Sequence, residues 1–134
     1  MSEEKQTKQT TKKKIDPTLR ETEQFLRGYQ LGKKLIAMDE YEKEVYGVGT
    51  TDQIWTPEQA RRRMAQVRAF LLSLDNREEK LLLYLYYIRG ESMERCAELL
   101  DLPRSTAYRM RKRALSLAAE RWEEKRRAAE QKGA

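Results

Sequence analysis

Apolar residues recur three or four positions apart along most of this chain, and no segment alternates apolar and polar residues as a half-buried strand does. The longest stretch with this spacing runs from Thr18 to Tyr46 without a proline. Its apolar positions are Leu19, Phe25, Leu26, Tyr29, Ile36, Tyr41 and Val45. The pattern predicts one long helix. Gly28 and Gly32 weaken this helix by about 1 kcal/mol each relative to alanine, and we interpret them as a kink or a close helix crossing.

Turn and capping signals divide the following residues into further helices. Residues 47–52 contain two glycines and two threonines and predict a turn. Thr56 then opens a helix with a capping-box pattern and Pro57 at its first position. A third helix is predicted to begin after Asp75, its N-cap, and to end at Gly90; its largely apolar surface is typical of a helix surrounded by others. The predicted fold class is therefore all-α.

Positive charge is concentrated at the N-terminus. The chain has 28 Lys and Arg residues against 22 Asp and Glu residues, and the formal net charge of +6 favours a polyanionic partner. Half of this charge lies between Met1 and Lys14, so we predict that residues 1–17 form a disordered basic tail. We assign residues 18–50 to a long helix for assembly or partner binding, and residues 51–134 to a helical domain with a single core.

The residue types that catalysis and metal binding need are nearly absent. The chain has no histidine and a single cysteine, Cys96, so it has no internal disulfide, no structural zinc site and no imidazole for acid–base chemistry. We therefore predict that it is not an enzyme and has no cofactor or metal site, and we interpret Cys96 as a small core residue. The apolar runs are too short for a membrane span or a signal peptide, which predicts a cytoplasmic protein without membrane contact.

Residues 91–119 carry the pattern of two helices joined by a tight turn. Ser92 is the predicted N-cap of a short first helix. The apolar face of that helix consists of Met93, Cys96, Ala97 and Leu100. Asp101 and Leu102 supply the turn, because aspartate tolerates the left-handed conformation at a helix end and leucine fills the gap between the helices. This spacing predicts a helix-turn-helix.

The second helix of this unit has an apolar face and a basic face. Its predicted apolar stripe is Ala107, Met110, Ala114 and Leu117. We predict that its other residues contact double-stranded DNA: Arg104, Ser105, Thr106, Tyr108, Arg109, Lys112 and Arg113. A solvated basic face is the alternative interpretation. The position of the cluster at the start of the second helix favours major-groove binding, because base-contacting residues lie there in helix-turn-helix proteins.

Two residues of this second helix are expected to face inward. Arg111 lies near the edge of the apolar stripe, and we expect it to pair with a carboxylate such as that of Glu98. Nothing between Ala114 and Gln131 interrupts the helix. We therefore interpret Trp122 as an anchor in the helical bundle or at a dimer seam, rather than as a ligand contact.

The stretch from Leu74 to Ala119 resembles the fourth region of bacterial sigma factors, which binds the upstream promoter hexamer. The likeness is carried by Leu74-Asp75-Asn76-Arg77-Glu78-Glu79, Tyr87-Ile88-Arg89-Gly90-Glu91-Ser92-Met93 and Arg104-Ser105-Thr106-Ala107-Tyr108-Arg109. The chain is more similar to small phage and prophage transcriptional regulators of the late-gene activator type, which carry this module behind a long helical segment. Asp101 in place of the usual glycine and Pro103 in place of the usual Ser or Thr cap depart from the family pattern.

Three functions are open at this point. The leading hypothesis is a sequence-specific transcription regulator, of phage or prophage origin, that binds double-stranded DNA through the helix starting near Arg104. The first alternative is a phage DNA-packaging subunit, similar to a small terminase, that assembles into a ring. The second alternative is a helical protein that binds RNA polymerase or another partner with little DNA affinity.

The long N-terminal helix leaves the assembly state open. Its apolar stripe is some 40 Å long at about 1.5 Å per residue, and we predict a homodimer through residues 19–46. In the alternative, this stripe folds back on the helix from Pro57 to Leu74. The protein is then a monomer that recruits RNA polymerase as its second contact.

Overall fold

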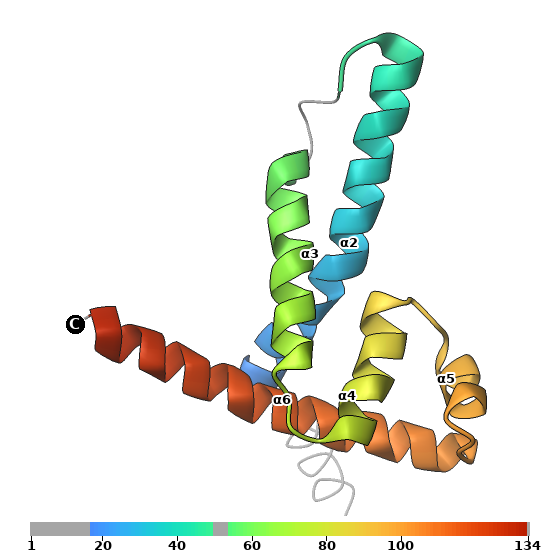
Figure 1. Cartoon of the computed structure of the whole chain (residues 1–134), viewed down its shortest axis with the longest axis vertical. Helices are drawn as coiled ribbons and strands as arrows, with labels where there is room; N and C mark the ends of the chain where they lie inside the picture. The colour runs from blue at the N-terminus through green and yellow to red at the C-terminus, as the bar shows by residue number, and fades with distance from the viewer. Residues whose placement is uncertain (1–16, 50–53, 134) are drawn as a thin grey trace, which may run out of the picture.

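The computed structural model describes residues 17–49 and 54–133, and every regular element in these ranges is a helix (Figure 1). The elements are α2 (Pro17–Tyr46), α3 (Pro57–Leu72), α4 (Arg77–Leu83), the π-helical segment η1 (Tyr84–Ile88), α5 (Met93–Leu99) and α6 (Arg104–Gly133). The predicted all-α fold class is confirmed for this part of the chain. The predicted tail lies almost entirely outside the described residues. In the described ranges, no helix combines the length and the apolar character that a bilayer crossing requires.

The predicted long helix is confirmed as α2, which forms an antiparallel hairpin with α3 (Figure 1). Its two glycines lie where the hairpin is tightest. A Cβ atom on Gly32 would lie 3.1 Å from the carbonyl oxygen of Ala60, and one on Gly28 would lie 3.0 Å from Cγ of Arg63. The glycines therefore mark a close helix crossing, because larger residues would push the two helices apart.

The predicted capping box at the start of α3 is confirmed. The backbone N–H of Gln59 donates to the Thr56 hydroxyl at 3.2 Å, and the backbone N–H of Thr56 donates to the Gln59 side-chain oxygen at 2.9 Å. Two donors that have no partner within the helix are thereby satisfied, which fixes the residue at which α3 begins.

The prediction of Asp75 as the N-cap of the third helix is wrong by one residue. Asn76 caps α4, and its side-chain oxygen accepts from the backbone N–H of Glu79 at 3.0 Å. Aspartate and asparagine are almost equally good caps, so local propensity does not separate adjacent candidates. The later start places Glu79 in the first turn of α4, where its side chain is buried against α6.

The third helix ends at Gly90 as predicted, but its last turn is π-helical. In η1 the backbone N–H of Arg89 donates to the carbonyl of Tyr84 at 3.1 Å, and Gly90 has a φ of +70°. The side chain of Gln30 on α2 donates to the carbonyl of Ile88 at 2.7 Å. A side chain from a distant helix thus satisfies a carbonyl at the end of η1. The sequence around η1 gives no sign of this contact.

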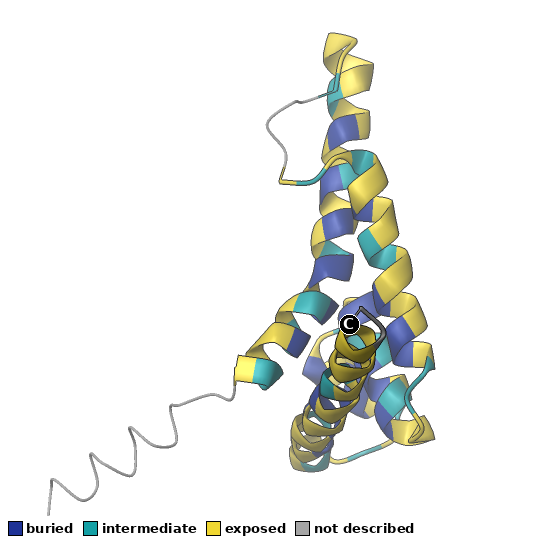
Figure 2. Cartoon of the chain, turned by 90° about the vertical axis from the view of Figure 1, so that its left-hand side faces the viewer, coloured by how far each residue is buried: buried dark blue, intermediate teal, exposed yellow. Residues whose placement is uncertain are grey.

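The larger core cluster lies where the α2–α3 hairpin meets η1 and α6. Its buried members are Leu26, Tyr29, Val67, Phe70, Leu71, Leu83, Tyr87, Ile88, Ala114, Leu115 and Ala118. The Trp122 ring packs against the rings of Phe25 and Phe70 at centroid distances of 4.5 and 5.8 Å. The prediction of Trp122 as a bundle anchor is confirmed. Figure 2 shows that buried residues gather around this junction, while the far end of α2 is mostly exposed.

Candidate nucleic-acid interface

A second core cluster holds α5 against α4 and α6. Its buried members are Leu82, Met93, Cys96, Ala97, Ala107 and Met110. Ser92 caps α5 as predicted, because its hydroxyl accepts from the backbone N–H of Arg95 at 3.1 Å. Cys96 is fully buried, and this burial raises the pKa of its thiol, in agreement with the predicted core role.

The turn between α5 and α6 is closed by two backbone hydrogen bonds. The N–H of Leu102 donates to the carbonyl of Ala97 at 2.9 Å, and the N–H of Asp101 donates to the carbonyl of Glu98 at 3.1 Å. This is the Schellman pattern, in which Asp101 adopts a positive φ of 55° and Leu102 packs onto the apolar cluster below it. The conformations predicted for both residues are confirmed, and together they fix the angle at which α6 leaves α5.

The buried side of α6 differs in part from the predicted stripe. Ala107, Met110 and Ala114 are buried as predicted, but Leu117 is 43% exposed and that assignment is wrong. Leu115 is buried instead. The buried face drifts around α6 because the helix first packs on α4 and α5, and then meets α2 on another side. An ideal stripe assumes one flat partner along the whole helix.

The opposite side of α6 is exposed over its first turns. Ser105, Tyr108, Arg109 and Lys112 are all exposed, whereas Thr106 is half-buried beside them. Within residues 17–49 and 54–133, no carboxylate lies at ion-pair distance from Arg109 or Lys112. These two cations are therefore presented to solvent without an internal partner.

A carboxylate on α5 engages two of the other predicted contact residues. Arg104 forms an ion pair with Glu94, and the Tyr108 hydroxyl donates to the same carboxylate at 3.4 Å. A hydrogen bond from its own backbone and one from Arg104 lower the pKa of Glu94, and the carboxylate in turn raises the pKa of Arg104. Sequence reasoning missed Glu94, because the contact depends on how α5 and α6 cross.

Arg113 lies at the edge of the exposed face. Its Nε donates to the buried carboxylate of Glu79 at 2.5 Å, although 65% of the Arg113 side chain remains accessible. Arg113 therefore ties α6 to the first turn of α4. In contrast to Arg109 and Lys112, Arg113 therefore has a carboxylate partner within the protein.

Arg111 points to the interior, but its predicted partner Glu98 is wrong. Its guanidinium lies 3.3 Å from Glu23 on α2, while Glu98 binds Arg95 at 2.9 Å. Glu23 also accepts from the Tyr87 hydroxyl at 3.0 Å, and burial raises the pKa of Tyr87 to about 12. Glu98 is nearer in sequence, but the three-helix junction places Glu23 closer in space.

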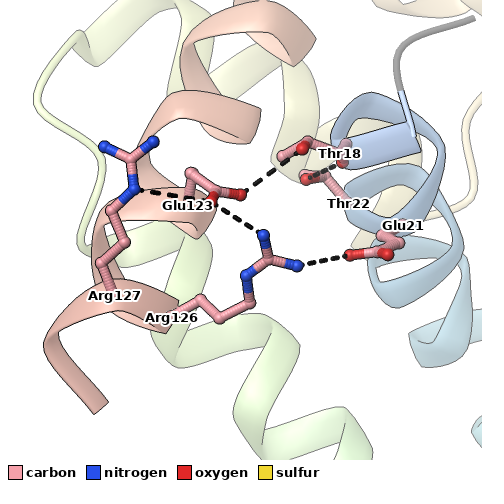
Figure 3. A network of polar contacts seen from close by, with 6 residues as sticks. All are labelled: Thr18, Glu21, Thr22, Glu123, Arg126 and Arg127. Atoms are coloured by element: carbon pink, nitrogen blue, oxygen red, sulfur yellow. Dashed lines mark hydrogen bonds and ion pairs between the residues drawn. The ribbon is translucent and has the colours of Figure 1, made fainter. Parts of the chain in front are cut away.

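The C-terminal half of α6 is tied to the start of α2 by the polar network in Figure 3. Glu123 binds Arg126 at 2.8 Å and accepts from the Thr18 hydroxyl at 3.4 Å. Arg126 also reaches Glu21 on α2 at 3.6 Å. Together with Trp122, this network seats one continuous helix on the bundle at one end and leaves the exposed basic face at the other.

Comparisons with protein-family models, with curated proteins and with solved structures each give no match. The chemistry of the face is that of hydrogen-bond donors: a guanidinium, an ammonium and two hydroxyls within the first three turns of α6. Such groups fit phosphate oxygens and the acceptor atoms of guanine in the major groove. In the part of the chain that the structure describes, no group of three or more metal-ligating side chains is close enough to hold an ion.

Proposed function

We propose that this protein is a sequence-specific double-stranded DNA-binding transcription regulator that inserts the first turns of α6 into the major groove. The α5–turn–α6 unit then acts as a helix-turn-helix, with α5 crossing above the groove and α6 as the recognition helix. The tight turn at Asp101 and the small residues Ala97 and Ala107 support this proposal, because they bring the two helices close together.

One observation carries the proposal: two cations on the exposed side of the first turns of α6 have no carboxylate partner among the described residues. Arg111 points into the bundle and binds Glu23 on α2. Arg113, at the edge of the exposed face, binds the buried carboxylate of Glu79 on α4. Arg109 and Lys112 face outward and have no such partner among the described residues. A helix whose cations served only packing would have no reason to collect unpaired cations at its exposed N-terminal turns, where helix-turn-helix proteins contact bases.

We assign a different role to Arg104 and Tyr108. The carboxylate of Glu94 holds both side chains at the start of α6 in the free protein. A DNA phosphate is chemically similar to this carboxylate and competes with it for the Arg104 guanidinium. Arg104 therefore contributes to positioning on the backbone, and Arg109 and Lys112 contribute to base recognition.

The resemblance to sigma region four supports a promoter or operator as the DNA target and RNA polymerase as a second contact. A phage or prophage origin belongs to the same proposal. A packaging subunit predicts a ring of many copies, so the mass of the free protein separates the two functions.

Selection of bound duplexes from a random pool tests the proposal, followed by affinity measurements on the selected and a scrambled duplex. We expect Arg109→Ala and Lys112→Ala each to weaken binding to the selected duplex about 5- to 150-fold, the range for a base contact. Arg61→Ala, which removes an exposed cation from α3, is the matched control and should change binding little.

Salt dependence completes this test. The logarithm of the binding constant should fall linearly with the logarithm of salt concentration, with a slope of about −0.9 for each phosphate contacted. A pool without an enriched sequence, or full affinity in Arg109→Ala and Lys112→Ala, would contradict the proposal.

A further inference from the structure

The far half of α2 carries an exposed apolar seam. Leu31, Met38 and Val45 are seven residues apart, and Tyr41 lies between the last two, which is the a and d spacing of a two-helix seam. The exposed fractions are 37% for Leu31, 51% for Met38, 61% for Tyr41 and 51% for Val45. Figure 2 shows this end of α2 rising beyond the buried part of the molecule. Four large apolar side chains in one row favour a partner surface.

The unpaired charges of α2 are segregated by sign. Among the described residues, six charged side chains of α2 lack an ion-pair partner: Arg20, Lys33 and Lys34 in the first part of the helix, and Glu40, Glu42 and Glu44 in the second. The other charges are satisfied within the chain, as when Asp39 binds Lys43 at 3.0 Å. The helix thus has a basic half and an acidic half on either side of Met38.

We propose that a second copy of this chain covers the seam, with the two α2 helices crossing antiparallel near Met38. An antiparallel crossing at this point places Lys34 of each copy, four residues before Met38, alongside Glu42 of the other copy, four residues after Met38. A parallel crossing would set lysines against lysines and glutamates against glutamates. Charge complementarity therefore selects both the partner, a second copy, and the direction of the crossing.

The same register accounts for an open groove at the base of the hairpin. Leu31 lies opposite Val45 of the other copy, and Leu31 lines a groove of about 1070 Å³ between α2, α3 and α6. The groove has aromatic and basic lining residues, among them Phe25, Phe70, Trp122, Arg63 and Lys125. Tyr46 and Val48, which are 72% and 70% exposed, are thereby presented to an apolar surface with a basic rim. The acidic end of each α2 helix thus lies against the groove of the other copy.

This association concerns the free protein and does not rest on DNA binding. A two-fold arrangement through α2 leaves α5 and the start of α6 uncovered in both copies. If the proposed function also holds, the dimer carries two recognition helices related by a two-fold axis, as palindromic operators require.

Light scattering and sedimentation of the full chain over the micromolar range test the seam. We expect a dimer, and we expect Met38→Glu to be monomeric because it buries an unpaired charge at the crossing point. The matched control is Leu81→Glu, which changes a similarly exposed leucine on α4 and should remain dimeric. Circular dichroism checks that both variants fold. A monomeric wild type, or a dimeric Met38→Glu protein, would overturn the proposal.

Charge reversal tests the direction. Lys34→Glu, and separately Glu42→Lys, should each raise the dimer dissociation constant on the order of tenfold. The two changes together should restore dimerisation, because opposite charges then face each other again. Arg77→Glu is the matched control at an exposed site away from α2. A parallel dimer predicts the same dissociation constant for all these proteins, so a lack of weakening and rescue would overturn the antiparallel arrangement.

Discussion

Glu23 on α2 and Arg111 on α6 are 88 residues apart in the sequence, and their side chains meet at 3.3 Å. The Tyr87 hydroxyl donates to the same carboxylate at 3.0 Å, and the Arg111 guanidinium lies 4.5 Å from the centre of the Tyr86 ring. These contacts join α2, η1 and α6 directly behind the exposed basic face. Arg111 is thus a structural residue, although it lies only two positions from the unpaired Arg109.

Arg111→Met should lower the free energy of unfolding by about 2 kcal/mol, because it removes a half-buried hydrogen bond to a charged group and leaves Glu23 without this partner. Arg109→Met should change it by no more than about 0.5 kcal/mol, since that side chain is exposed and unpaired. Urea denaturation measures both values. On DNA affinity the order should reverse, with the larger loss for Arg109→Met. Equal effects of the two changes on stability would contradict this assignment of faces.

Tyr87 should make the fold sensitive to alkaline pH. The pKa of Tyr87 is raised from 10.0 to about 12, mainly by burial, so the folded protein keeps a proton that the unfolded chain loses between these values. Below pH 10 both states are protonated and stability does not depend on this group. Above it, the free energy of unfolding should fall by about 1.4 kcal/mol per pH unit until about pH 12.

Urea denaturation between pH 9 and pH 12 measures this slope as the difference between the wild type and Tyr87→Phe, which lacks the ionising group. At neutral pH, Tyr87→Phe should be less stable by about 1 kcal/mol, because it loses the hydrogen bond to Glu23. The two proteins should converge as the pH rises. Tyr108→Phe, which retains Tyr87, serves as the control and should keep the wild-type slope. Parallel curves for the wild type and Tyr87→Phe would refute the prediction.

Asp101→Gly should raise the free energy of unfolding by about 1 kcal/mol, because Asp101 is held at a φ of 55° and glycine adopts this conformation without steric cost. Asp101→Ala should be less stable than the wild type, since alanine lacks the local hydrogen bonding that helps aspartate there. Among the described non-glycine residues only Asp101 has a positive φ, so Asp75→Gly is the control and should bring no gain. Thermal denaturation should rank glycine above aspartate and aspartate above alanine.

Glu94→Gln should tighten DNA binding, because it frees Arg104 and Tyr108 and removes a negative charge beside the proposed phosphate contact. The plot of log binding constant against log salt should steepen by about 0.9 if Arg104 gains one phosphate. Glu98→Gln changes the net charge equally on the same helix, but its carboxylate binds Arg95 instead. A similar gain from both variants would mean that only net charge matters.

The local elements of this fold were largely predictable. Ser92 and Thr56 cap helices as their positions indicate, and Asp101 takes the left-handed conformation at the helix end. These features depend on hydrogen bonds between residues within a few positions of each other, so the chain specifies them locally. The exposure of Arg109 and Lys112 was equally predictable, because a helix fixes the angle between its apolar and polar positions.

The errors have a common cause in contacts made across the fold. Arg111 binds Glu23 rather than Glu98, and Leu115 rather than Leu117 is buried. The π-helical end of η1 is likewise capped by Gln30 from α2. Each outcome depends on which helix lies against α6 or η1, and no periodicity within one helix contains that information.

The sequence by itself determined where helices begin and end to within about a residue, and which face of α6 is basic, because capping and the 3.6-residue period act over one or two turns. Only the tertiary structure decided which cations are left unpaired. Pairing depends on side chains converging from distant helices, as Glu79 and Glu23 do on Arg113 and Arg111. The same packing covers the first part of α2 with α3 and leaves its second part, around Met38, exposed.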